Sequence, residues 1–142
     1  MSEDTRKTIV LTGASRGIGH ATVRRFSNEG WRVITCSREE VPEDCRRDPN
    51  WTHHVTADLR NQEGLDAFLR RATEILDGGP VHALVNNAAV SPKTPFKERL
   101  GVLNGDMREW REVFELNLFA PLALARGFAV PLRKGKGCIV NI

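Results

Sequence analysis

A glycine-rich turn near residue 15 is the feature of this sequence with the clearest chemical use. Gly13, Gly17 and Gly19 stand in the run Thr-Gly-Ala-Ser-Arg-Gly-Ile-Gly at positions 12–19, directly after the apolar residues 8–11. Glycine permits backbone conformations and close approaches that a side chain would block. The helix expected to follow directs its unpaired N–H groups, and the positive end of its dipole, at an anion. This order of strand, turn and helix predicts a diphosphate-binding site.

A polar residue, Asn117, interrupts an apolar stripe on a long helix expected from Asp106 onward. The stripe consists of Trp110, Val113, Asn117, Pro121, Leu124 and Phe128. Burying an unpaired amide costs roughly 1–3 kcal/mol, so Asn117 is expected to have partners. Pro121 has no N–H, which leaves the Asn117 carbonyl without its helical donor and open to a water molecule. A simple kink without function is the alternative.

Strands and helices in alternation position these groups. We expect strands at about 7–12, 32–36, 51–57, 81–86 and 138–142, with helices beginning near 17, 61 and 106. Strands separated by crossover helices form a parallel sheet, and right-handed crossovers give a doubly wound α/β arrangement. Asn61 is expected to cap the second helix, and Asp106 with Glu109 to form a capping box. Residues 38–50 and 91–105 are expected to be loops.

Helical spacing predicts which side chains face the sheet. On the first helix these are Ile18, Ala21, Thr22 and Phe26. On the second they are Leu65, Phe68, Leu69, Ala72, Ile75 and Leu76. A second stripe on the long helix is expected to face away from the sheet, and it consists of Leu116, Phe119, Ala123, Gly127 and Val130. Because an exposed apolar face of this kind is rare on a monomer, we expect the helix 106–134 to pack against a helix of another subunit.

The glycine spacing G-x-x-x-G-x-G does not stand alone. It is followed in order by Asp58, by Asn86-Asn87-Ala88-Ala89, and by Asn117 in Glu-Leu-Asn-Leu. In these motifs the sequence resembles the short-chain dehydrogenase/reductase family, from the first strand onward. The family usually has glycine where Ala89 stands.

The resemblance implies a nicotinamide dinucleotide cofactor and assigns residues to it. In the turn and after the second strand, these are Gly13, Ser15, Arg16, Gly17, Ile18, Gly19, Ser37 and Arg38. Asp58 and Leu59 would lie at the adenine, and the backbone of Asn87 and Ala88 at the adenine-side ribose. Asn117 would belong to the catalytic set, with a water on its carbonyl linked to a catalytic lysine.

The end of the second strand bears on the choice of cofactor. A site for NAD usually has Asp or Glu there, whereas this sequence reads Cys36-Ser37-Arg38. Arg38, together with Arg16, can pair with the 2′-phosphate of NADP through charge-assisted hydrogen bonds. We therefore predict NADP, with NAD less favoured, although Glu39 and Glu40 follow at once. The alternative for Arg38 is a solvated surface charge.

The chain contains no tyrosine, whereas the family's main acid is a tyrosine in Tyr-x-x-x-Lys with a serine upstream. Because the sequence ends within an apolar strand, we expect one dinucleotide-binding domain of Rossmann type, residues 1–142, truncated after its fifth strand within a longer enzyme. The resemblance implies that this enzyme transfers a hydride between nicotinamide and a carbonyl or alcohol substrate. A non-catalytic nucleotide sensor or scaffold that retains the fold is the alternative, and nucleic-acid binding is a third.

Composition argues against several other classes. The net charge of +3 is spread along the chain, which does not indicate a nucleic-acid partner. Three widely spaced cysteines predict neither disulfides nor a Cys-x-x-Cys metal site, and they favour the cytoplasm. The polar first seven residues are not a signal peptide, and the apolar region 116–132 is too broken to span a membrane. His53 and His54 alternate along a strand, so no metal site is expected there.

Overall fold

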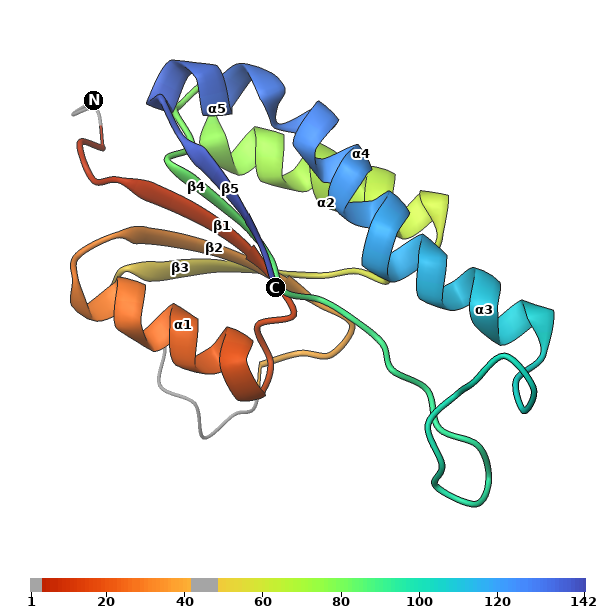
Figure 1. Ribbon diagram of the computed structural model, residues 1–142. Helices are drawn as coiled ribbons and strands as arrows, with labels where there is room; N and C mark the ends of the chain where they lie inside the picture. Colours follow the sequence, from red (N-terminus) through yellow and green to blue (C-terminus); the bar gives the residue numbers. More distant parts are fainter. Residues whose placement is uncertain (1–3, 42–48) are drawn as a thin grey trace.

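A computed structural model describes residues 4–41 and 49–142 (Figure 1). A five-stranded sheet in the order β3-β2-β1-β4-β5, parallel throughout, forms its centre. The strands are β1 Thr8–Thr12, β2 Arg32–Ser37, β3 Trp51–Thr56, β4 Ala83–Asn86 and β5 Cys138–Asn141. The helices are α1 Gly17–Asn28, α2 Gln62–Leu76, α3 Met107–Phe114, the π-helical turn η1 Glu115–Phe119, α4 Ala120–Gly127 and α5 Ala129–Gly135. The doubly wound α/β prediction is confirmed.

Helices cover both faces of the sheet. Helix α1 lies on one face, whereas α2, α4 and α5 lie on the other (Figure 1). All five residues of β1 are buried, as expected for a central parallel strand covered on both sides. The α1 side packs around Val23, Val33 and Trp51, and the α2 side around Phe68 and Phe128.

The inward face of α1 differs from the prediction. The buried residues are Gly19, Val23 and Ser27, whereas Ile18 is 63% exposed. A Cβ at Gly19 would overlap the Gly13 carbonyl oxygen, so the helix backbone touches the turn at this position. That contact sets the helix rotation, and residues four and eight positions later then face the sheet.

The capping predictions are confirmed. The Asn61 side chain accepts the Gly64 N–H, and Asp106 with Glu109 forms a capping box. Leu65, Phe68, Ala72 and Leu76 of α2 are buried as predicted, with Leu69 and Ile75 partly buried.

The long helix is continuous from α3 through η1 to α4, and it bends by 63° before α5. Its buried stripe consists of Leu116, Ala120, Leu124, Phe128 and Leu132. The predicted inward position of Asn117 and the predicted outward positions of Leu116 and Ala123 are therefore wrong. The helical spacing is compatible with either Leu116 or Asn117 facing the sheet. Burying Leu116 leaves no side-chain hydrogen-bonding group unpaired, whereas burying Asn117 would, so the helix turns Leu116 inward.

The structure describes all of the predicted loop 91–105 but only part of the predicted loop 38–50. Residues 91–105 form an irregular segment that extends from the body of the protein (Figure 1), with one antiparallel bridge between Lys93 and Arg99. The expected loop 38–50 is described only outside 42–48, and Cys45 lies within that gap. In the described ranges no single helix has the length and apolarity to cross a bilayer, and only the bent pair 107–127 and 129–135 meets that test jointly.

Candidate functional site

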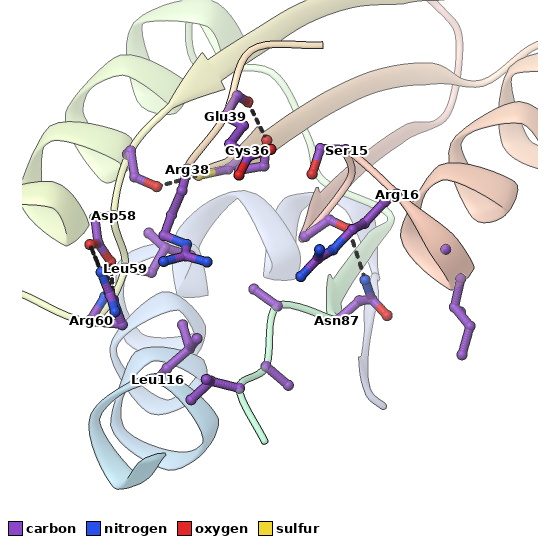
Figure 2. Close-up of a pocket in the computed structure, with 18 residues that line it drawn as sticks. Ser15, Arg16, Cys36, Arg38, Glu39, Asp58, Leu59, Arg60, Asn87 and Leu116 are labelled. Carbon is purple, nitrogen blue, oxygen red and sulfur yellow. Dashed lines mark hydrogen bonds and ion pairs between the residues drawn. The ribbon is translucent and has the colours of Figure 1, made fainter. Parts of the chain in front are cut away.

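A cleft of about 310 Å³ lies at the carboxyl ends of β1, β2, β3 and β4 (Figure 2). Ligands of open parallel sheets bind at this edge. Its lining combines the glycine turn, the residues after β2 and β3, the segment after β4 and Leu116 of η1. The lining residues are Gly13, Ser15, Arg16, Gly17, Ile18, Cys36, Ser37, Arg38, Glu39, Ala57, Asp58, Leu59, Arg60, Asn87, Ala88, Ala89, Val90 and Leu116.

The three glycines of the turn are needed for different reasons. Gly13 has φ +71° and lies so close to Ala88 that a Cβ would come within 2.9 Å of its backbone. Gly19 packs directly under the Gly13 carbonyl. Gly17 has φ +58° and open space where its Cβ would be. The turn is therefore tightly packed on its protein side and open on the side that faces the cleft.

The start of α1 is suited to an anion. Its N-cap residue, Arg16, makes no side-chain capping bond, and the first turn contains no acidic residue. The first N–H groups of a helix have no partner within the helix, so they remain donors for a ligand here. A diphosphate group fits this combination of open turn and uncapped helix.

Side-chain hydrogen bonds connect the ends of β1 and β4. Thr12 Oγ1 accepts the N–H groups of Asn87 at 3.2 Å and Ala88 at 3.1 Å. The Asn87 carboxamide donates to the Gly13 carbonyl at 3.0 Å. Asn86 Nδ2 donates to Asn141 Oδ1 at 2.8 Å, which ties β4 to β5. Ala89 is not among the described residues with positive φ, so its methyl group causes no backbone strain.

Two arginines, Arg16 and Arg38, bring positive charge to the cleft. Both line it and both are exposed, and Figure 2 shows their guanidinium groups pointing into it from α1 and from the end of β2. Within the described ranges neither forms an ion pair, so both charges are available to a ligand. Glu39 also lines the cleft and adds a negative charge nearby.

A third arginine, Arg60, was not anticipated from the sequence. It binds the Asp58 carboxylate through Nε at 3.0 Å and Nη2 at 2.7 Å, and its N–H donates to Oδ1 at 3.0 Å. These bonds, with a smaller contribution from the charge of Arg38, hold the pKa of the Asp58 carboxyl below its ordinary value. Glu112 of α3 lies 3.8 Å from Arg60. The sequence does contain a signal for this contact: Asp58 is followed two residues later by an arginine, and an Asp side chain commonly bonds the backbone two residues on, as in an Asx turn.

The wall beside Asp58 is apolar. Leu59 and Leu116 are buried but reach the cleft. Ala57 and Val90, which are partly buried, line it as well. Cys36 lies here too, and burial raises the pKa of its thiol to about 12, so it remains protonated. The chemistry of this part of the lining, apolar side chains beside a carboxylate, suits a planar apolar group with polar edges, such as a nucleobase.

Asn117 lies outside the cleft. It lines an adjacent depression of about 510 Å³ together with Pro121, Asn141 and other residues of η1, α4 and β5. Its carboxamide bonds the Val90 backbone twice: Oδ1 accepts the Val90 N–H and Nδ2 donates to the Val90 carbonyl, both at 2.9 Å. The Ala120 N–H donates to the Glu115 carbonyl, five residues back, just before Pro121. The water-binding role of the Asn117 carbonyl stays a prediction.

The structure brings together eleven of the twelve residues predicted to bind the cofactor, all in the lining of one cleft. Gly19 is the exception, because it packs under the Gly13 carbonyl on the protein side of the turn. Seven further residues line the cleft without having been predicted to bind the cofactor: Cys36, Glu39, Ala57, Arg60, Ala89, Val90 and Leu116. Among residues 4–41 and 49–142, no group of three or more His, Cys, Asp or Glu side chains is arranged to hold a metal ion.

Comparison with known proteins agrees with this geometry. The family described as short chain dehydrogenase matches residues 7–142. Protein FixR of Bradyrhizobium diazoefficiens is 45% identical over 96% of this chain and 49% of its own length. The ketoacyl reductase HetN of a Nostoc species is 32% identical over the whole chain and 49% of its length. The chain thus spans about half the length of these relatives.

A solved structure shows the same arrangement. An oxidoreductase of the short chain dehydrogenase/reductase family from Brucella ovis, in complex with a partially ordered NAD, is 46% identical. It superimposes with a TM-score of 0.80 over 94% of this chain and 61% of the other.

Proposed function

Because the chain belongs to the short-chain dehydrogenase family, we propose that it binds NADP(H) for an oxidoreductase acting on a carbonyl or alcohol substrate. When bound, the nicotinamide group supplies the hydride chemistry. The residues described above bind and orient the dinucleotide. The substrate is a small molecule, and the cytoplasm is the proposed location.

The observation that carries the choice of NADP is the position of Arg16 and Arg38. Both guanidinium groups point into one cleft, Arg16 from the glycine turn and Arg38 from the end of β2, and neither forms an ion pair within the described ranges. A 2′-phosphate adds negative charge and acceptor oxygens, for which an arginine offers a planar set of donors. The Brucella protein is named for its NAD complex, whereas a metagenomic relative, 28% identical, is named for NADP. The proposal therefore rests on the arginines of this chain.

Each group in the cleft has a part in binding. The N–H groups around Gly17 and the start of α1 hold the diphosphate. Asp58 accepts a hydrogen bond from the adenine amino group, while Leu59 and Leu116 cover the ring. Ser37 and Arg38 lie at the adenosine ribose, where the two cofactors differ. Asn117 holds the segment after β4 in place through Val90.

Titration of the full-length protein with NADPH and NADH tests the proposal. NADPH is expected to bind more tightly, and Arg38→Ala should weaken NADPH binding about ten- to hundredfold, as expected for hydrogen bonds to charged groups. NADH binding should change little. Arg24→Ala is the matched control, because Arg24 is an exposed arginine of α1 outside the cleft. Equal affinity for both cofactors, unaffected by Arg38→Ala, would contradict the choice of NADP.

An exposed apolar stripe supports a homo-oligomer. Phe114, Leu118 and Leu122 follow one another at intervals of four along η1 and its neighbouring helices, and each is about half exposed. Phe119 lies beside them and is also half exposed. We propose that this face of α3, η1 and α4 packs against a second copy, giving a homodimer or homotetramer.

A further inference from the structure

A chain of hydrogen-bonded side chains runs behind the cleft, beneath the turn that follows β2. Trp51 Nε1 donates to Thr35 Oγ1 at 2.9 Å, and Thr35 Oγ1 lies 2.8 Å from Nδ1 of His54. Nε2 of His54 lies 3.1 Å from Ser37 Oγ and 3.0 Å from the Glu39 carbonyl oxygen. His54 thus connects the interior of the sheet with two residues that line the cleft.

The partners fix the direction of these bonds. A carbonyl oxygen only accepts, so Nε2 of His54 carries a proton that it donates toward Glu39 and Ser37. The Ser37 hydroxyl donates its own proton to the same Glu39 carbonyl at 2.6 Å. Thr35 Oγ1 accepts from the buried Trp51, and its own proton has two acceptors within reach, Nδ1 of His54 at 2.8 Å and the His53 carbonyl at 3.3 Å. The shorter distance favours the bond to Nδ1. The chain runs from Trp51 through Thr35 and His54 to the turn.

The Glu39 carbonyl therefore accepts from two donors, the Ser37 hydroxyl and the His54 N–H, and one of them is enough to pair it. If Ser37 rotates its proton toward a ligand, the His54 N–H still satisfies the carbonyl. Without His54, the same rotation would leave that carbonyl with no side-chain donor. Ser37 is 7% exposed and lines the cleft, so a ligand in the cleft would meet it at a largely buried position.

From this geometry we infer that His54 is a positioning residue for cofactor selection, acting through Ser37. It frees the Ser37 hydroxyl to donate to a 2′-phosphate, which only accepts hydrogen bonds. A ribose 2′-hydroxyl can itself donate to Ser37 Oγ, so the unphosphorylated cofactor does not need that rotation. His54 therefore favours the phosphorylated dinucleotide. The inference rests on the proposed function, because it concerns how the same site distinguishes NADPH from NADH.

The test is the ratio of the NADH and NADPH dissociation constants in the full-length protein. His54→Ala should weaken NADPH binding by roughly three- to tenfold, the net value of one hydrogen bond, and NADH binding by less than twofold. His54→Gln places a donor near the position of Nε2 and should restore the ratio. His54→Asn reaches only the position of Nδ1, so it should preserve the bond to Thr35 and still lose the preference.

Two controls separate this role from a structural one. His53→Gln changes the adjacent strand residue, whose side chain alternates to the other face, and should leave the ratio unchanged. In the Ser37→Ala background, His54→Ala should no longer alter the ratio, because the two residues act as one unit. A preference that survives both His54→Ala and His54→Asn, or equal losses for the two cofactors, overturns the inference. A wild-type protein that prefers NADH instead overturns the proposed function, and this result appears before any variant is made.

Discussion

The Asn117 carboxamide pairs with the backbone of Val90 as a second strand would, accepting its N–H and donating to its carbonyl, both at 2.9 Å. This pair joins η1 to the segment that leaves β4 and lines the cleft. Residues 91–105, which follow, extend away from the sheet (Figure 1). The amide therefore determines where that segment begins.

Asn117→Asp tests this attachment. The carboxylate still accepts the Val90 N–H, but it faces the Val90 carbonyl with a lone pair instead of a donor. We expect a loss of about 1–2 kcal/mol in the free energy of unfolding and faster proteolysis between residues 91 and 105. Limited proteolysis and urea unfolding measure both. Asn28→Asp, at an exposed position at the end of α1, is the control, and equal cleavage rates in the two variants would argue against a special role for Asn117.

The two glycines Gly17 and Gly19 should respond differently to alanine. At Gly19 the added methyl overlaps the Gly13 carbonyl oxygen, so we expect a loss of about 1–3 kcal/mol in stability together with loss of cofactor binding. At Gly17 the methyl meets no protein atom, but φ is positive, which costs roughly 1–2 kcal/mol. Gly17→Ala should fold and still bind cofactor poorly, because the methyl occupies the open side of the turn.

Gly30→Ala is the matched control for Gly17→Ala. Its φ is +79°, its Cβ position is also open, and it lies at the far end of α1. Thermal unfolding should give similar losses for the two variants, whereas fluorescence titration should show a binding defect only for Gly17→Ala. Normal NADPH affinity in Gly17→Ala would mean that the ligand does not approach this face.

The ion pair between Asp58 and Arg60 predicts a pH dependence. The folded-state pKa of Asp58 lies below its ordinary value of 3.8, so its contribution is complete above that value. It is lost as the pH falls from about 3.8 through the folded-state pKa. Asp58→Asn should cost about 0.2–1 kcal/mol at pH 7, because the pair is partly exposed, and less at pH 3. Urea unfolding at pH 7 and pH 3 measures the difference. In the Arg60→Gln background, Asp58→Asn should cause little further loss in the free energy of unfolding.

The exposed apolar stripe of Phe114, Leu118 and Leu122 predicts that a charge placed on it weakens subunit association. Leu122→Glu places a carboxylate at a half-exposed position of α4 without disturbing the core. If this face packs against a second copy, sedimentation should show a shift of the full-length protein toward a smaller assembly. Val102→Glu changes an equally apolar, more exposed residue of the loop 91–105 and should leave the assembly unchanged. An unaltered assembly in Leu122→Glu would place the contact elsewhere.

The fold could be predicted because its signals are local. The apolar runs 8–11 and 83–85, the stop at Gly30 and the caps at Asn61 and Asp106 each depend on a few neighbouring residues. The cleft could be predicted because parallel strands bring their carboxyl ends to one edge. The positions of Arg60 and Leu116 in the cleft could not be predicted. Each depends on how a turn or a helix is rotated about its axis, and sequence spacing does not distinguish one residue from its neighbour as the inward-facing one. The face of α1 was missed for the same reason, as it depends on the contact between Gly19 and Gly13.

The bonds that the Asn87 and Ala88 N–H groups donate to Thr12, and that the Asn87 side chain donates to Gly13, lie beyond the end of the ladder between β1 and β4. Loops at such a position usually fluctuate independently, and a ligand that orders them loses affinity in doing so. Here folding itself has already restricted both loops to one arrangement. A dinucleotide would therefore meet a surface of preset shape, and little of its interaction energy would be consumed in immobilising the protein.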